Sequence, residues 1–166
     1  MLQLALFITA FLPMILESRV ASRNEARLRA AGAVEPPHDV FATMRVVYPG
    51  SFLAMLLESW ITGRSAPITL PAGIALFTAA KTLKYWAVVT LGTRWTFRVL
   101  VPPQSVRIVS GPYRFMRHPN YAGVIGELSG FALMAGAPLA GVAAVAAYIG
   151  LMRARIRIEE RALGLR

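Results

Sequence analysis

Long runs of apolar residues, separated by short arginine-rich stretches, are the feature that most restricts how this chain can fold. Crossing a ~30 Å hydrocarbon core takes about 20 apolar residues in a helix, and 56% of the 166 residues are hydrophobic. The runs predict membrane spans at about 1–17, 46–62, 68–91, 119–135 and 138–152. The sequence therefore predicts one all-α, polytopic domain covering residues 1–166.

The last two predicted spans come from a single apolar stretch, 119–152. One helix of that length would be about 45–50 Å long, well beyond the hydrocarbon core. The segment Gly136-Ala137-Pro138 interrupts it, since glycine and proline are the residues that most readily end a helix and turn the chain. We expect a helical hairpin here, followed by a polar continuation of the last helix.

The arginines are distributed very unevenly among the connecting segments. Segments 18–45, 92–118 and 153–166 carry five arginines each, whereas the remaining connections carry only Arg64. With five spans, all fifteen fall on one side, and the positive-inside rule then predicts a cytoplasmic C-terminus and an outside N-terminus in an inner or plasma membrane. The net charge of +10 therefore predicts membrane lipids, and not nucleic acid, as partners.

Charged residues also occur inside the predicted spans, where each needs a partner or a polar cavity. Lys84 and Glu127 lie at matching depths, about 10–12 Å from the inner end of their spans, so they are predicted to pair, with Lys81 as the alternative partner. The pair could be a structural pin or could line a substrate cavity. Glu58, near an outer end, is expected to reach water.

Polar chemistry concentrates at the entrance to the fourth span. The run 111–123 reads Gly-Pro-Tyr-Arg-Phe-Met-Arg-His-Pro-Asn-Tyr-Ala-Gly, and its His118 has an ordinary pKa near neutrality. About 35 residues later comes Arg155-Ile-Arg-Ile-Glu159-Glu160. Arg155 and Glu159 are four residues apart and share a helix face, although the two glutamates could also be a solvated acidic pair. With no cysteine, neither a disulfide nor a thiolate metal site is expected, and no metal site is predicted.

These two motifs, with a helical hairpin between them, resemble the isoprenylcysteine carboxyl methyltransferase family, to which phospholipid methyltransferases are related. The resemblance covers residues from about 80 to 166. It implies S-adenosylmethionine as cofactor, bound in a pocket at the cytoplasmic side. It also implies that Arg155 acts on the acceptor as the catalytic residue. The residues that it implies for cofactor binding are Val106, Arg107, Ile108, Tyr113, His118, Pro119, Asn120, Tyr121 and Glu159.

A site at the membrane boundary suits this chemistry, because the cofactor is water-borne and the acceptor is a lipophilic small molecule or lipid. The acceptor would present a carboxylate, phenol or amine. Only three residues follow Leu163, so the element that closes the pocket is expected to be shorter than in the family or to come from elsewhere in the chain. Two alternatives remain open: an NADPH-dependent reductase of the sterol reductase type, and a non-catalytic membrane interaction module. No particular protein partner is indicated.

Trp60, Trp86 and Trp95 are expected to be interfacial anchors.

Overall fold

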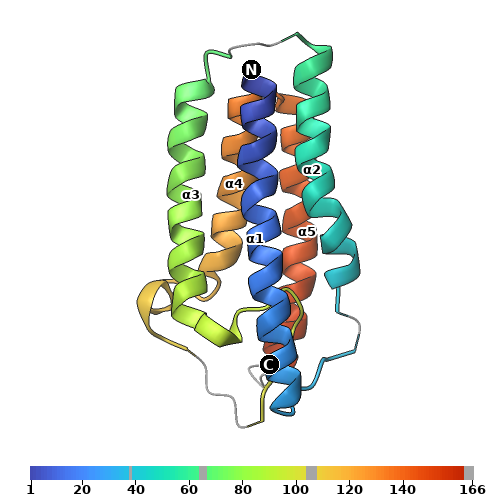
Figure 1. The fold of residues 1–166 in the computed structure, drawn as a ribbon, viewed down its shortest axis with the longest axis vertical. Coiled ribbons are helices and arrows are strands. Elements are labelled where there is room, and N and C mark those ends of the chain that lie inside the picture. Colours follow the sequence, from blue (N-terminus) through green and yellow to red (C-terminus); the bar gives the residue numbers. More distant parts are fainter. Residues whose placement is uncertain (38, 64–66, 104–107, 163–166) are drawn as a thin grey trace.

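A computed structural model describes residues 1–37, 39–63, 67–103 and 108–162, and within these ranges the chain is built from helices. The single β-type contact among the described residues is an isolated antiparallel bridge between Val34 and Val101. The elements, shown in Figure 1, are α1 (Leu2–Ala30), α2 (Phe41–Ile61), α3 (Leu70–Leu91), η1 (Gly92–Arg94), η2 (Gly111–Arg114), α4 (Pro119–Ala135) and α5 (Pro138–Ala162).

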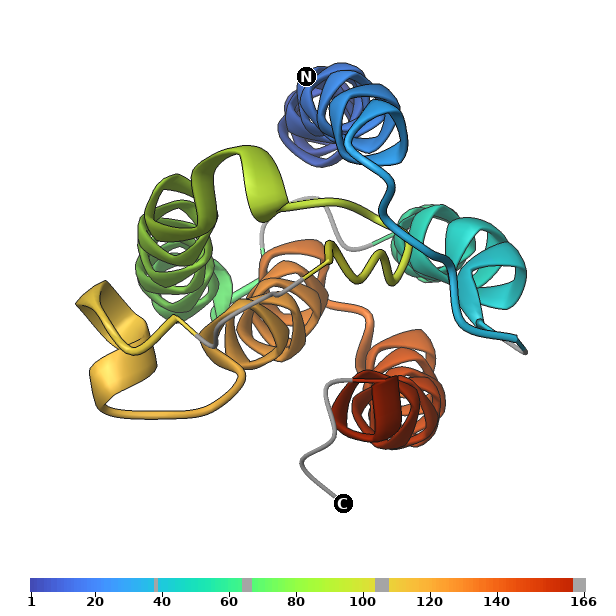
Figure 2. The same ribbon diagram turned by 90° about the horizontal axis from the view of Figure 1, so that it is seen from below.

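Successive α-helices run in opposite directions, so the two chain ends lie at opposite ends of the bundle (Figure 1). One end carries the α1–α2 linker, segment 92–118 and the end of α5, and we call it the motif end; the opposite end is the far end. Viewed from the motif end, α4 lies in the middle of the bundle, and residues 95–103 pass across it from the end of α3 toward α2 (Figure 2).

Among the described residues, three helical segments are long and apolar enough to cross a membrane: Leu2–Ala30, Leu70–Arg94 and Pro138–Arg161. Much of their apolar surface faces outward, for example at Leu12, Ile74 and Val142, as lipid contact requires. The chain is therefore an all-α integral membrane protein. Spans at α2 and α4 stay a prediction; α4 has only 17 residues.

The first helix differs from its predicted form. The predicted span ends at residue 17 and an arginine-rich segment follows it, but α1 is one continuous helix of 29 residues that runs through both parts. Nothing between the two parts breaks it, since Ser18 bonds back to the carbonyl of Ile15 at 2.8 Å and the following residues are largely good helix formers. It ends where Gly32 takes a φ of +82°. The predicted break between α4 and α5 is present, with Gly136 in the left-handed region at φ +62°.

At the far end, Glu58 is not simply a solvated residue. Its carboxylate accepts hydrogen bonds from the backbone N–H groups of Leu139 (3.2 Å) and Ala140 (2.6 Å). These donors belong to the first turn of α5, which has no intrahelical partner for them. Glu58 therefore ties the end of α2 to the start of α5.

Helices α3 and α4 pack with their backbones unusually close. A Cβ atom added at Gly130 would lie 2.6 Å from the backbone nitrogen of Phe77, and one at Gly73 would lie 2.6 Å from that of Met134. One at Gly126 would meet the Cβ of Ala80 at 2.7 Å. The small residues Gly126 and Gly130 thus allow the close helix packing.

Substitution of Gly130 by alanine is expected to destabilise the protein by about 1–3 kcal/mol, because the new methyl group would force the backbones of α3 and α4 apart. Gly150 on α5 is the matched control, since no heavy atom lies within 4 Å of the place that a Cβ atom would take there. Gly150→Ala should be neutral or slightly stabilising, because alanine favours a helix. Unfolding in mixed micelles would measure the stability of both variants. Equal losses of stability in Gly130→Ala and Gly150→Ala would contradict the packing argument.

Candidate functional site

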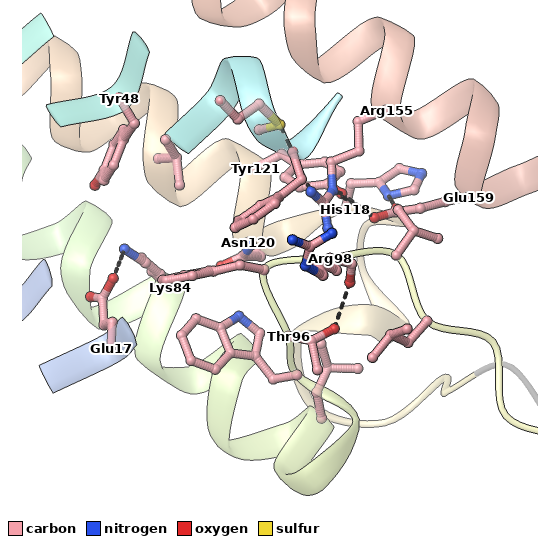
Figure 3. A pocket seen from close by; sticks show the side chains of 18 of the residues that line it. Glu17, Tyr48, Lys84, Thr96, Arg98, His118, Asn120, Tyr121, Arg155 and Glu159 are labelled. Atoms are coloured by element: carbon pink, nitrogen blue, oxygen red, sulfur yellow. Dashed lines mark hydrogen bonds and ion pairs between the residues drawn. The ribbon is translucent and has the colours of Figure 1, made fainter. Parts of the chain in front are cut away.

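A cavity of about 670 Å³ occupies the half of the bundle next to the motif end. Its walls come from α1, α2, the end of α3, residues 94–102, the motif, α4 and α5. Figure 3 shows two polar groups of side chains in it. Tyr121, Arg155 and Glu159 lie on one side, and Glu17 and Lys84 lie on the other. A volume of this size suits a cofactor-sized ligand.

The motif places its side chains through one 3₁₀ turn and one helix start. Gly111, at φ +54°, opens the η2 turn, and Pro112 packs into the interior. His118 then takes a non-helical conformation (φ −132°, ψ 61°) before α4, and Pro119 occupies the first helical position, where its missing N–H costs nothing. The His118 ring stacks on the ring of Tyr121, with centroids 5.5 Å apart and an interplanar angle of 11°.

The two sequence motifs meet at Arg155. Its Nε donates to the hydroxyl oxygen of Tyr121 at 2.8 Å and to Oε1 of Glu159 at 3.1 Å, and the Tyr121 hydroxyl donates to the same carboxylate oxygen. Arg155 is 5% exposed, and its Nη1 lies 3.9 Å from Oδ1 of Asp39. The predicted Arg155–Glu159 face is therefore present. However, Arg155 is held by the residues expected to bind the cofactor, and does not stand apart from them.

Glu160 is not part of a solvated acidic pair. It is 5% exposed, and its Oε1 lies 3.8 Å from Nη1 of Arg117 and 3.9 Å from Nε2 of His118. On the other side of the imidazole, Nδ1 of His118 lies 3.8 Å from Oε2 of Glu159. The imidazole of the first motif thus lies between the two carboxylates of the second.

Most of the residues that the motifs pointed to are brought together. Those that line the cavity are Ile108, Tyr113, His118, Asn120, Tyr121, Arg155 and Glu159. Pro119 is buried at the start of α4 and serves the helix and not the cavity wall. Val106 and Arg107 lie outside the described residues. Asn120 has a buried side-chain oxygen with no hydrogen-bond partner among the described residues, and burial together with the charge of Glu159 raises the pKa of Tyr113.

Sequence reasoning missed the segment that covers the cavity at the motif end. We call residues 95–102 the strap; all eight line the cavity. Backbone contacts hold the strap, because Asn24 donates to the carbonyl of Trp95 at 2.8 Å and Asp39 accepts from the N–H of Val99 at 2.9 Å. Trp95 is 3% exposed, so it is a cavity residue and not the interfacial anchor that its place in the sequence indicated.

Ion pairs join the strap to the α1–α2 linker. Nη1 of Arg98 donates to Glu35 at 2.7 Å, its backbone N–H donates to Glu25 at 3.3 Å, and Arg29 also pairs with Glu35. Burial alone would raise the pKa of the Glu35 carboxyl, but the hydrogen bonds from Arg29 and Arg98 outweigh it and lower that pKa. The linker thus supplies two of the acids that hold the cavity cover, Glu35 and Asp39, and α1 supplies Glu25. The only signal was three acids within an arginine-rich stretch.

At the deep side of the cavity lies a group of four charges, which we call the ion cluster: Glu17, Lys81, Lys84 and Glu127. The predicted Lys84–Glu127 pair is present at 3.4 Å, but Lys84 is closer to Glu17, at 2.6 Å. Lys81 bridges the same two acids at 3.1 and 3.2 Å. Glu17, placed at the end of the first predicted span, was missed because α1 continues past it.

Tyr48 and Tyr148 extend the ion cluster toward Arg155. The Tyr48 hydroxyl donates to Glu127, and its ring lies 5.4 Å from that of Tyr148. Tyr148 in turn precedes Arg155 by two helical turns on α5. In the part of the chain that the structure describes, no group of three or more His, Cys, Asp or Glu side chains could hold a metal ion.

Comparison with known proteins finds two relatives and one family. The chain is 31% identical over 151 residues to the uncharacterized protein YpbQ of Bacillus subtilis, covering 89% of this chain and 88% of that protein. It is 25% identical over 145 residues to an uncharacterized protein of Haemophilus influenzae, covering 87% and 84%. No solved structure matches the chain significantly. The profile of the isoprenylcysteine carboxyl methyltransferase (ICMT) family matches residues 73–164, which contain most of α3, both motifs and the hairpin. The chain therefore belongs to this family.

Proposed function

We propose that this protein is an integral-membrane methyltransferase that transfers a methyl group from S-adenosylmethionine to a lipophilic or amphiphilic acceptor. The observation that carries the proposal is the meeting of both family motifs at the Tyr121–Arg155–Glu159 contacts, inside one cavity. S-adenosylmethionine would supply an electrophilic methyl group on a sulfonium. Methyl transfer needs mainly positioning, so the protein requires no nucleophile of its own.

The residues on this side of the cavity fit the cofactor. Its hydroxyl and ammonium groups need hydrogen-bond acceptors. Oε1 of Glu159 accepts the hydrogen bonds from Tyr121 and Arg155, so Oε2 can serve the cofactor. The buried oxygen of Asn120 is a second acceptor that lacks a donor among the described residues. The stacked rings of His118 and Tyr121, with Tyr113, offer aromatic surfaces for adenine or the sulfonium cation.

The chain's own residues have separate tasks in this proposal. Glu159 and Asn120 hold the cofactor, and Arg155 fixes the positions of Tyr121 and Glu159 by its two hydrogen bonds. The strap covers the cavity at the motif end and keeps water out of it. Asp39 and Asn24 hold the strap in this place by hydrogen bonds to its backbone.

Ligand stabilisation tests the proposal. We expect S-adenosylhomocysteine at about 100 times its Kd to stabilise the purified protein by about 2.7 kcal/mol, seen as a rise in melting temperature, and NADPH to have no effect. Stabilisation by NADPH alone would favour a reductase instead. Stabilisation by neither nucleotide would favour a non-catalytic module.

We also propose that the motif end faces the cytoplasm, because all fifteen of the unevenly distributed arginines belong to segments that reach it. The chain contains no cysteine, so single cysteines can report its orientation. Thr62→Cys at the far end should react with a membrane-impermeant maleimide in intact cells. Arg157→Cys, on exposed α5 surface near the motif end, should react only after the cells are permeabilised. The reverse pattern would contradict this orientation.

A further inference from the structure

The ion cluster is larger than a structural pin requires. Glu127 is fully buried and Lys84 is 3% exposed, and all four members lie on helices at the depth of the apolar bundle. One ion pair would be enough to hold two helices together, and each additional buried charge carries a further desolvation cost. Two acids and two bases at this depth are a candidate functional site.

Only part of the ion cluster faces the cavity. Glu17 and Lys84 line it together with Tyr48, whereas Glu127 and Lys81 lie behind them. A ligand in the cavity would therefore meet one carboxylate and one ammonium group that are 2.6 Å apart. Beside them, the cavity wall is apolar, formed by Phe11, Met14 and Val124.

Three of the cations on the cavity wall, Lys84, Arg155 and Arg98, already have acidic partners. Lys84 contacts Glu17 and Glu127, and Arg155 contacts Glu159 at 3.1 Å. In the strap, Arg98 contacts Glu35 at 2.7 Å. A carboxylate ligand would have to compete with these protein carboxylates and would add an unbalanced negative charge to a buried site. An uncharged hydroxyl or amine could instead donate to Glu17 and accept from Lys84 without changing the net charge.

We propose that Glu17 and Lys84 bind the polar end group of the methyl acceptor, and that they select an uncharged hydroxyl or amine over a carboxylate. This inference rests on the proposed function and narrows its acceptor class. The acceptor's apolar part lies along Phe11 and Met14, and its polar end lies between the ion cluster and the cofactor side of the cavity. Glu17 and Lys84 are thus specificity-determining residues supplied by α1 and α3.

Three probes that share one apolar tail test this selectivity: para-octylphenol, para-octylaniline and para-octylbenzoate. Their affinities would be measured by calorimetry on the full-length protein in lipid nanodiscs, with and without S-adenosylhomocysteine. The phenol and the aniline should bind at least about tenfold more tightly than the benzoate, the discrimination expected for a buried hydrogen bond to a charged group. Equal or tighter binding of the benzoate would overturn the proposal.

A charge-balanced double variant tests the residues. Glu17→Gln with Lys84→Met removes one acid and one base together, so that Lys81 and Glu127 remain as a pair. It should weaken phenol binding about tenfold and abolish the preference over the benzoate, while S-adenosylhomocysteine binding stays within about twofold. Retention of the preference in a variant that still binds S-adenosylhomocysteine would overturn the assignment.

Arg45 provides the matched control, because it is an exposed cation that also lines the cavity. Arg45→Gln should change none of the probe affinities, and a loss of benzoate binding in this variant would show that the cavity accepts carboxylates at another place. Failure of S-adenosylhomocysteine to bind the wild-type protein would count against the proposed function alone. The relative affinities of the three probes, measured without S-adenosylhomocysteine, would still show whether Glu17 and Lys84 select an uncharged end group.

Discussion

Replacing Glu127 by glutamine is expected to lower the free energy of unfolding by about 3–5 kcal/mol, the cost of breaking a buried ion pair from one side. The side chain is fully buried, and without its charge Lys81 and Lys84 would share Glu17 as the one remaining acid of the ion cluster. Unfolding in mixed detergent micelles would measure the loss. Arg153→Gln, on exposed surface of α5, is the control and should be nearly neutral.

A second substitution separates charge balance from general damage to the core. Lys81→Met added to Glu127→Gln leaves one acid, Glu17, facing one base, Lys84, and should recover more than half of the lost stability. Residues in one ionic network are not additive, and the double-mutant cycle measures their coupling. Purely additive losses would mean that the four charges do not act as a unit.

Glu159→Gln should weaken S-adenosylhomocysteine binding by about 10- to 100-fold, because a hydrogen bond to a charged group is worth about 1.5–3 kcal/mol. The substitution keeps the shape of the side chain but removes the charge that Arg155 and Tyr121 position. Calorimetric titration would give the affinities. Glu58→Gln, at the far end of the bundle, is the matched control and should leave the affinity unchanged.

Arg155→Ala is also expected to weaken cofactor binding, and not only to affect the acceptor. Its Nε is bonded to both Tyr121 and Glu159, so its loss would release both side chains. Arg155→Lys should restore little, because an ammonium group lacks the planar donor geometry of a guanidinium. If Arg155→Ala left the affinity for S-adenosylhomocysteine unchanged, Arg155 would have a role in acceptor binding alone.

Features with a local signal could be predicted from the sequence. The α4–α5 turn follows from a glycine that takes the left-handed conformation and a proline that starts the next helix. Arg155 and Glu159 share a face because of helical spacing. Tyr121 and His118 were assigned to the cofactor pocket by the family resemblance and not by a local signal. The match in depth between Lys84 and Glu127 was sufficient to predict their contact.

Features that depend on distant partners could not be predicted in this way. The role of Glu17 depends on α1 continuing past it and packing beside α3, and nothing in its neighbourhood indicates this. Asp39 and Glu35 hold the strap because residues 60 or more positions away fold back onto the linker. Trp95 was expected to be an interfacial anchor because it lies near a span end in the sequence. That position is a weak signal, because a loop can turn inward and bury the side chain, as it does here.

The order in which the ion cluster's charges occur along the chain has a consequence for membrane insertion. During synthesis, α1 enters the bilayer with the carboxylate of Glu17 uncompensated. Arrival of α3 with two lysines reverses the sign of the excess charge, and only α4, which brings Glu127, balances it. A nascent chain that stops before α4 therefore keeps an unneutralised ion in hydrocarbon, at a cost of several kcal/mol.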